Sequence, residues 1–288
     1  MADLIGVLGV TNNPLMWARL QGPLPDDLVR VADNFGRFRS IVSDLAPDVI
    51  VLVASDHFHM LMTATMPAFM IGKAPIMRAG FPNEIRQFGL SPTQVMGDPE
   101  LAAYLLGGRD LTPGIEFAFS DEPWLDHSFL VPLLLLIPKL DIPVVPVFTN
   151  CNAPPIPTAA RFAALGMYLG EAIRASGDDR RVLVIGSGHL AHELGGPRQF
   201  LGASPDPDFD QLAVGWMADG SLTEAIATTS FDRLTKAGNE SYQFLNFISC
   251  LALVEGAPAV FAEGTTTRFG ALPFFYWEMP GGRRSSLS

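Results

Sequence analysis

The stretch "RVLVIGSGHLAHELGG" (181–196) joins a strand-like run to a group of polar side chains. Its first part, Val182–Gly186, is apolar and β-branched, which is typical of a buried strand in a parallel sheet. A glycine-rich turn follows, and His189, His192 and Glu193 then come within five positions. Ligands of α/β proteins bind at the carboxyl ends of strands, so this order predicts an α/β fold with its site at this point.

Similar apolar runs recur along the chain and alternate with longer segments that have helical spacing. The predicted strands are Leu4–Val10, Val49–Ala54, Ala68–Gly72, Val144–Phe148 and Val182–Gly186, and the predicted helices are Asp26–Leu45, Pro157–Ser176 and Asn239–Val254. This alternation indicates one α/β domain (1–280) with a central, mostly parallel or mixed sheet flanked by helices. The active site is expected at the carboxyl ends of the strands. Long Pro/Gly-rich loops are predicted at 72–97, 107–125, 149–157 and 195–209, and a flexible tail at 281–288.

The composition excludes several classes of protein. Of 288 residues, 48% are hydrophobic and 17% charged, which suits a large packed core, and the net charge of −11 argues against a nucleic-acid partner. Two cysteines without a CxxC motif argue against a disulfide framework or a thiolate zinc site. The longest apolar stretch (129–138) is too short to cross a bilayer, and the first residues lack the features of a secretory signal. We therefore expect a cytoplasmic protein with no membrane contact.

The five histidines of the chain fall in three places. His57 and His59 follow the strand that ends at position 54, His189 and His192 follow the strand that ends at position 186, and His127 lies between a loop and an apolar helix. If these strands are parallel, their ends meet at one edge of the sheet, as a metal site or an acid–base site requires.

Each of these residues also has a structural interpretation that involves no chemistry. A single histidine after a strand is commonly a hydrogen-bonding loop residue, and Asp56 or Asp126 could form an Asx turn with the backbone. Glu193 could be a favourable carboxylate at the start of a helix. The clustering of the histidines favours a site over these alternatives, but spacing alone does not identify its chemistry.

Four segments, in this order, resemble motifs of one family, the class III extradiol dioxygenases, which is typified by the catalytic β subunit of protocatechuate 4,5-dioxygenase. They are "SDHFHMLMTATMPAFMIGKA" (55–74), "LDHSFLVPLLLL" (125–136), "IGSGHLAHELGG" (185–196) and "AGNESYQFLNFISCLAL" (237–253). The resemblance extends along most of the chain.

The resemblance implies a non-haem Fe(II) site built from two histidines and one glutamate. His57 matches a histidine ligand and Glu240 matches the carboxylate ligand. His192 matches the histidine that transfers protons, and His127 matches a second active-site histidine that hydrogen-bonds the substrate or the oxygen species. Asp56 is expected to orient His57 or its loop.

One position departs from the family pattern. The family has its first histidine ligand directly after the first strand, whereas this chain reads "GVTNNPLM" (9–16) with Asn12 at that place. Asn12 could bind the metal through its amide oxygen, or His59 or His189 could act as a substitute ligand. Alternatively, the iron is lost and the chain is a non-catalytic paralogue or a supporting subunit, or the pocket serves another divalent-metal reaction.

The sequence thus predicts an Fe(II)-dependent extradiol dioxygenase that cleaves a catechol-like or aminophenol-like aromatic ring with O₂ at a modified metal site. A substrate carboxylate has two candidate partners, Arg268 or the run Thr265–Thr267. Family members commonly pair their catalytic subunits, and some add a small second chain. The resemblance therefore predicts a homo-oligomer and allows for a small partner subunit.

Overall fold

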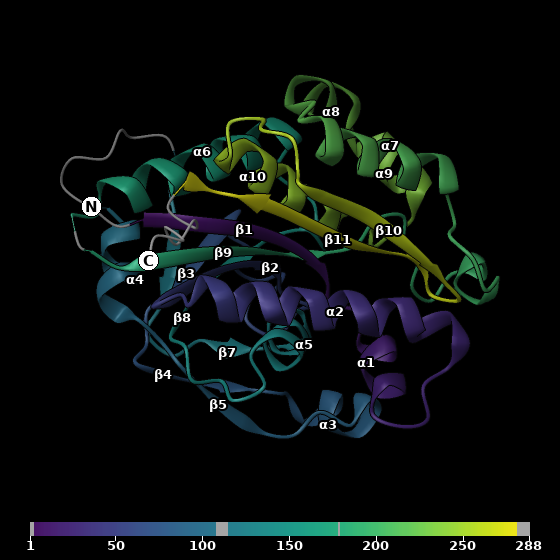
Figure 1. Ribbon diagram of the computed structural model, residues 1–288, viewed down its shortest axis with the longest axis horizontal. Coiled ribbons are helices and arrows are strands. Elements are labelled where there is room, and N and C mark those ends of the chain that lie inside the picture. Colours follow the sequence, from purple (N-terminus) through teal and green to yellow (C-terminus); the bar gives the residue numbers. More distant parts are fainter. Residues whose placement is uncertain (1–2, 108–114, 178, 281–288) are drawn as a thin grey trace, which may run out of the picture.

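The computed structural model describes residues 3–107, 115–177 and 179–280 (Figure 1). Within these residues the main sheet has eight strands, in the spatial order β10 (Phe261–Thr267), β11 (Gly270–Glu278), β1 (Asp3–Thr11), β9 (Arg181–Gly188), β2 (Val49–Ser55), β8 (Val144–Thr149), β3 (Phe69–Gly72) and β6 (Ala118–Ser120). The four central strands β1, β9, β2 and β8 are parallel, whereas β11 and β3 run antiparallel to β1 and β8. The predicted α/β fold with a mixed sheet is therefore confirmed.

Helices cover both faces of the sheet (Figure 1). One face carries α1 (Pro14–Leu20), α2 (Asp26–Leu45) and α5 (His127–Leu136), and the other carries α4 (Pro99–Leu105), α6 (Ala159–Ala175), α7 (Pro207–Asp219), α8 (Leu222–Thr228), α9 (Phe231–Ala237) and α10 (Leu245–Leu253). Two 3₁₀ turns, Pro197–Phe200 and Ser241–Phe244, precede α7 and α10. In the described part of the chain, no helix is both long enough and apolar enough to cross a membrane.

The five predicted strands are all present, and the helix predicted at Asp26–Leu45 has the observed bounds. That helix is amphipathic: its buried apolar side chains recur at three- and four-residue intervals from Leu28 to Leu45. The helix predicted from Asn239 begins later, because Ser241–Phe244 forms a 3₁₀ turn before α10.

The prediction of one long loop at 72–97 is wrong. This segment contains β4 (Ile76–Ala79), α3 (Pro82–Phe88) and β5 (Thr93–Met96), and β4 and β5 form a small second sheet with β7 (Trp124–Leu125). These elements have seven residues or fewer, so periodicity could not reveal them, and the proline at 82 occupies the first helical position, where it is tolerated. Residues 108–114 of another predicted loop and the predicted tail 281–288 lie outside the described residues.

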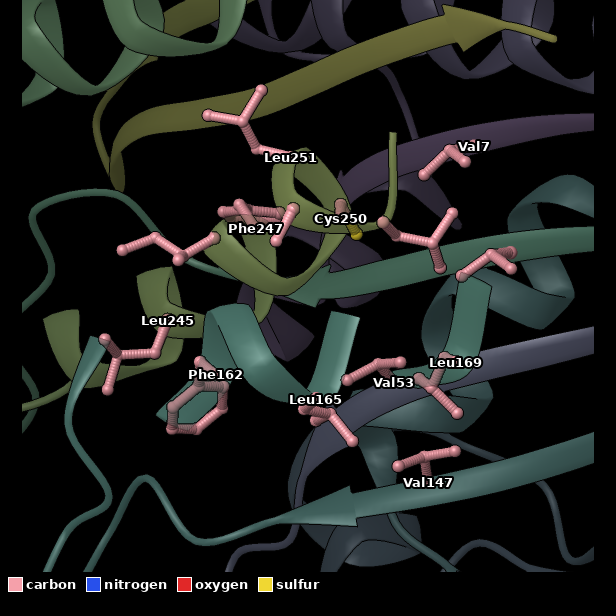
Figure 2. Packing of buried hydrophobic residues seen from close by; sticks show 14 of the residues in the cluster. Val7, Val53, Val147, Phe162, Leu165, Leu169, Leu245, Phe247, Cys250 and Leu251 are labelled. Carbon is pink, nitrogen blue, oxygen red and sulfur yellow. The ribbon is translucent and has the colours of Figure 1, made fainter. Parts of the chain in front are cut away.

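The largest apolar cluster lies between the sheet and the pair α6 and α10 (Figure 2). Phe162 and Leu165 of α6 and Phe247 of α10 belong to this cluster, together with valines from the central strands. The two helices approach closely because Gly166 has no side chain: a Cβ there would lie 1.9 Å from the Ser249 carbonyl oxygen. Both cysteines of the chain, Cys151 and Cys250, have buried free thiols in this core.

Candidate active site

A cavity of about 250 Å³ lies at the carboxyl ends of the central parallel strands. It is lined by Asn13, Pro14, Leu15, His57, Gln87, Phe88, His127, His189, His192, Leu194, Gln199 and Glu240. Four of the five histidines therefore meet in one cavity with Glu240. The predicted location of the site at the ends of the strands agrees with this arrangement.

His57 is held by a buried carboxylate. Asp126, at the start of α5, accepts hydrogen bonds through Oδ2 from the His57 backbone N–H (2.8 Å) and from the ring Nδ1 (2.9 Å). Burial lowers the pKa of His57, but the charge and hydrogen bond of Asp126 and the charge of Glu240 outweigh it and raise this pKa to about 9. Because Nδ1 is engaged, Nε2 is the ring atom that is left to bind a ligand.

Asp56 shapes the loop after β2. Its carboxylate accepts hydrogen bonds from the backbone N–H groups of His59, Met60 and Leu61, which confirms the Asx-type turn. Burial and the charge of Asp126 raise the pKa of Asp56 to about 6. Asp56 therefore orients the loop, whereas the carboxylate that orients His57 is Asp126. From the sequence, Asp126 was expected only as a possible Asx-turn residue.

His127, the first residue of α5, is paired with a second buried carboxylate. Its Nδ1 lies 2.7 Å from Oε1 of Glu84 in α3, and its backbone N–H donates to the same oxygen at 2.9 Å. The His57 and His127 rings lie 4.2 Å apart between centroids. Glu84 comes from the segment predicted as a loop, and no sequence signal marked it.

His189 and His192 lie side by side, with ring centroids 4.4 Å apart. Burial lowers the pKa of His192 and takes that of His189 well below its ordinary value. Burial therefore favours the neutral form of both rings.

Two other polar residues of the predicted set lie away from these rings. Glu193 does not begin a helix, because positive-φ Gly195 interrupts the segment. Instead, Glu193 forms a partly buried ion pair with Arg198. His59 is not among the lining residues; its ring packs on Phe81 at 4.0 Å, and Nε2 lies within hydrogen-bond distance of Asn83.

Glu240 reaches the cavity from the turn between α9 and α10. Its backbone N–H donates to the His192 carbonyl oxygen at 3.1 Å, and its Oε2 lies 3.9 Å from His57 Nε2. Gly238 permits this approach, since a Cβ there would lie 2.1 Å from the same His192 oxygen. Gly188, at the end of β9, permits a second close approach. A Cβ at this position would lie 2.4 Å from the Gln243 carbonyl oxygen.

Gln243, which was not among the predicted site residues, is fully buried between the candidate ligands. Its Nε2 lies 3.0 Å from His57 Nε2 and donates a hydrogen bond to Glu240 Oε2 at 2.9 Å. Its Oε1 accepts a hydrogen bond from Asn12 Nδ2 at 3.0 Å, and Asn12 Oδ1 is buried without a hydrogen-bond partner. The spacing of three residues from Glu240, across a 3₁₀ turn, was the one available signal.

The donor atoms suit a hard or borderline divalent metal such as Fe(II). His57 contributes an imidazole nitrogen and Glu240 a carboxylate, and an unpartnered amide oxygen of Asn12 lies beyond Gln243. Among the described residues, close groups of histidine and carboxylate ligand atoms also occur at His57, Asp126 and His127, and around Asp56 and His59. The Asp126 oxygens are occupied by hydrogen bonds to His57 and to the N–H and hydroxyl of Ser128, so this residue supports His57.

A second cavity, of about 240 Å³, adjoins the first. Leu15, His192 and Gln199 line both cavities, and Arg198 and Arg268 lie at the second one. Arg198 is paired with Glu193, and Arg268 is paired with Asp27 at 2.8 Å.

In this α/β fold, histidines and a glutamate lie around one cavity at the ends of the strands. This arrangement is typical of metal-dependent enzymes. The model of the catalytic LigB subunit of aromatic ring-opening dioxygenases matches residues 6–272, and the chain belongs to this family. The resemblance to class III extradiol dioxygenases is confirmed.

Several relatives carry one name, 2,3-dihydroxyphenylpropionate/2,3-dihydroxicinnamic acid 1,2-dioxygenase. The protein of that name from Rhodococcus jostii (strain RHA1) is 32% identical over 82% of this chain and 70% of its own length. One from Rhodococcus sp is 27% identical over 88% of this chain and 90% of its own length. In fold, the chain is similar to the crystal structure of an uncharacterized protein from Escherichia coli K12, with a TM-score of 0.61 and 16% identity over 94% of this chain and 99% of that one.

Proposed function

We propose that this protein is an Fe(II)-dependent extradiol dioxygenase that opens the ring of a catechol bearing a short carboxylated side chain. The observation that carries the proposal is the convergence of His57, His127, His192 and Glu240 on one cavity at the sheet edge. Membership of a family of ring-opening dioxygenases supports the reaction, and the names of the relatives support the substrate class.

In this proposal His57 and Glu240 hold the metal ion. The ion, when bound, supplies a site for the catechol oxygens and for O₂. Asp126 fixes the proton of His57 on Nδ1, so that Nε2 is available as a donor atom. The protein thereby presents one nitrogen and one carboxylate at the same wall of the cavity.

His192 and His127 serve the organic substrate. A catechol must lose a proton when it chelates a cation, and the neutral ring of His192 accepts that proton and later returns it. Glu84 fixes the proton of His127 on Nδ1, which leaves Nε2 to hydrogen-bond a substrate hydroxyl or an oxygen that gains negative charge. Both atoms of O₂ enter the product while one ring C–C bond breaks, so no external reductant is required.

The adjoining cavity accommodates the side chain of the substrate. It opens beside His192 through shared lining residues, and Arg268 lies at it with about half of its side chain exposed. A cation in the lining of this cavity can pair with a short chain that ends in a carboxylate.

Anaerobic reconstitution with Fe(II), followed by O₂ uptake with a panel of catechols and aminophenols, tests the proposal. We expect one O₂ consumed for each yellow ring-opened product, with 2,3-dihydroxyphenylpropionate among the better substrates. His192→Ala should lower the rate by about 10²- to 10⁴-fold and retain the metal, whereas Glu240→Ala should lose the metal. An iron-loaded protein that consumes no O₂ with any member of the panel would overturn the proposal.

A further inference from the structure

We propose that the side-chain amide of Gln243 replaces the missing histidine as a protein ligand of the metal ion, and that Asn12 positions it. The inference rests on the proposed function only in taking His57 and Glu240 as the metal-binding pair. It assigns the third protein ligand to Gln243, which follows Glu240 by three residues.

Gln243 lies at a suitable place for a third metal ligand. The terminal amide atom of Gln243 that faces the site lies 3.0 Å from His57 Nε2 and 2.9 Å from Glu240 Oε2, and these two atoms are 3.9 Å apart. Donor atoms that share one first-row metal ion at bond lengths of about 2.0–2.2 Å have separations of this size. Asn12, the residue at the family's histidine position, reaches this group only through its hydrogen bond to Gln243.

The amide group of Gln243 can offer an oxygen to a cation. In the structure, Gln243 Nε2 lies next to His57 Nε2 and donates a hydrogen bond to Glu240 Oε2. A cation attracts the carbonyl oxygen instead, and a half-turn of the amide plane exchanges oxygen and nitrogen with little movement of other atoms. Amide oxygens are accepted ligands of hard divalent ions, although they bind more weakly than imidazole.

Asn12 provides the hydrogen-bond partner that Gln243 needs when its oxygen binds a metal ion. After the half-turn, Gln243 Nε2 points toward Asn12 and needs an acceptor there. Asn12 can supply one, because its Oδ1 is buried and lacks a hydrogen-bond partner. A matching half-turn of Asn12 pairs this oxygen with Gln243, so the two amides act as a coupled pair. An asparagine at position 12 thus suits a glutamine ligand, whereas a leucine would leave the amide without an acceptor.

The experiment measures binding of Co(II), a spectroscopic substitute for Fe(II), by competition with a chromophoric chelator. We compare wild type with Gln243→Leu, Gln243→Glu and Asn12→Leu, and record the visible Co(II) absorption of each loaded protein. Gln199→Leu is the matched control, since Gln199 lines the same cavity but its Oε1 accepts from the Gly195 N–H instead. Melting temperatures identify any variant that fails to fold.

We expect Gln243→Leu to weaken Co(II) binding by about 10- to 100-fold and to change the Co(II) absorption, and Asn12→Leu to weaken binding less. Gln243→Glu, which keeps an oxygen donor and adds charge, should bind at least as tightly as wild type, and Gln199→Leu should bind like wild type. Wild-type or tighter binding by Gln243→Leu would overturn the inference, because it would show that the amide competes with the metal.

The variant with glutamate keeps the test decisive if the leucine variant does not fold: weaker binding by Gln243→Glu also contradicts a ligand role. The fate of the proposed function is separate. If wild-type protein binds Co(II) in a Gln243-dependent way but cleaves no catechol, the proposed dioxygenase function is wrong and the ligand role of Gln243 stands. If wild-type protein cleaves catechols but Gln243→Leu binds Co(II) with unchanged affinity, the dioxygenase function stands and the ligand role of Gln243 is wrong.

Discussion

Glu84 and His127 form a buried pair whose charge can be removed with almost no change of shape. Glu84 is 1% exposed, and its Oε1 lies 2.7 Å from His127 Nδ1. Glu84→Gln keeps an oxygen that can accept from Nδ1 but lacks the negative charge. We expect slower ring cleavage, because the carboxylate stabilises a positively polarised imidazole while Nε2 hydrogen-bonds the substrate.

The magnitude follows from the kind of hydrogen bond that is lost. A bond to a charged acceptor contributes about 1.5–3 kcal/mol and a neutral one about 0.5–1.5 kcal/mol. The difference of about 1–1.5 kcal/mol corresponds to roughly a 5- to 13-fold lower rate, if the bond is needed in the transition state. The effect on substrate binding should be smaller, so KM should change by less than about twofold.

The assay is the single-turnover rate of ring cleavage by iron-loaded protein mixed with O₂ after anaerobic substrate binding. The matched control is Glu116→Gln, which makes the same change at a side chain that is 94% exposed. Metal content and melting temperature are measured for both variants. A wild-type rate in folded, iron-loaded Glu84→Gln would refute the role given to this pair.

Three further changes have defined outcomes. Gly188→Ala places a Cβ 2.4 Å from the Gln243 carbonyl oxygen. Urea unfolding should therefore show a free energy of unfolding that is lower by about 1–3 kcal/mol, and Co(II) titration should show weaker binding. Unchanged values would contradict the close approach. Arg268→Leu should raise KM for 2,3-dihydroxyphenylpropionate by roughly tenfold and leave that for unsubstituted catechol unchanged, whereas equal effects on both would argue against a carboxylate contact. The Arg268 hydrogen bond lowers the pKa of Asp27 to about 2, so this pair stabilises the fold above pH 4 and loses its effect as the pH falls toward 2. Urea unfolding of Asp27→Asn at pH 6 and pH 3 should therefore show a smaller pH-dependent loss than wild type, and an equal loss would contradict it.

The sequence predicted the parts of the molecule that depend on strong periodicity. Apolar β-branched runs predicted the central strands, and the histidines that follow them meet at one sheet edge because parallel strands end together. The small second sheet was missed because its strands have four residues or fewer. Glu84 was missed with it, since its contact with His127 depends on where that sheet places α3.

The remaining site residues show why motif matching is incomplete. Asp126 and Asp56 both precede a histidine in the sequence, and only the packing of α5 against β2 makes Asp126 the carboxylate on His57. Gln243 lies inside the family-like segment 237–253, but the resemblance gives it no role. Its position depends on the fold, because Gly188 lets its backbone approach the end of β9. The homo-oligomer, the small partner chain and the cytoplasmic location stay predictions.

The burial of the two thiols has a practical consequence for work with this protein. Burial raises the pKa of both Cys151 and Cys250 to about 12, so neither is a thiolate at neutral pH. In the folded protein, both thiols should therefore react very slowly with alkylating reagents and resist oxidation during aerobic handling. Both cysteines belong to one core cluster, so labelling should occur only when that core opens. The rate of alkylation, followed by mass spectrometry, then reports the rate of global unfolding without any engineered probe.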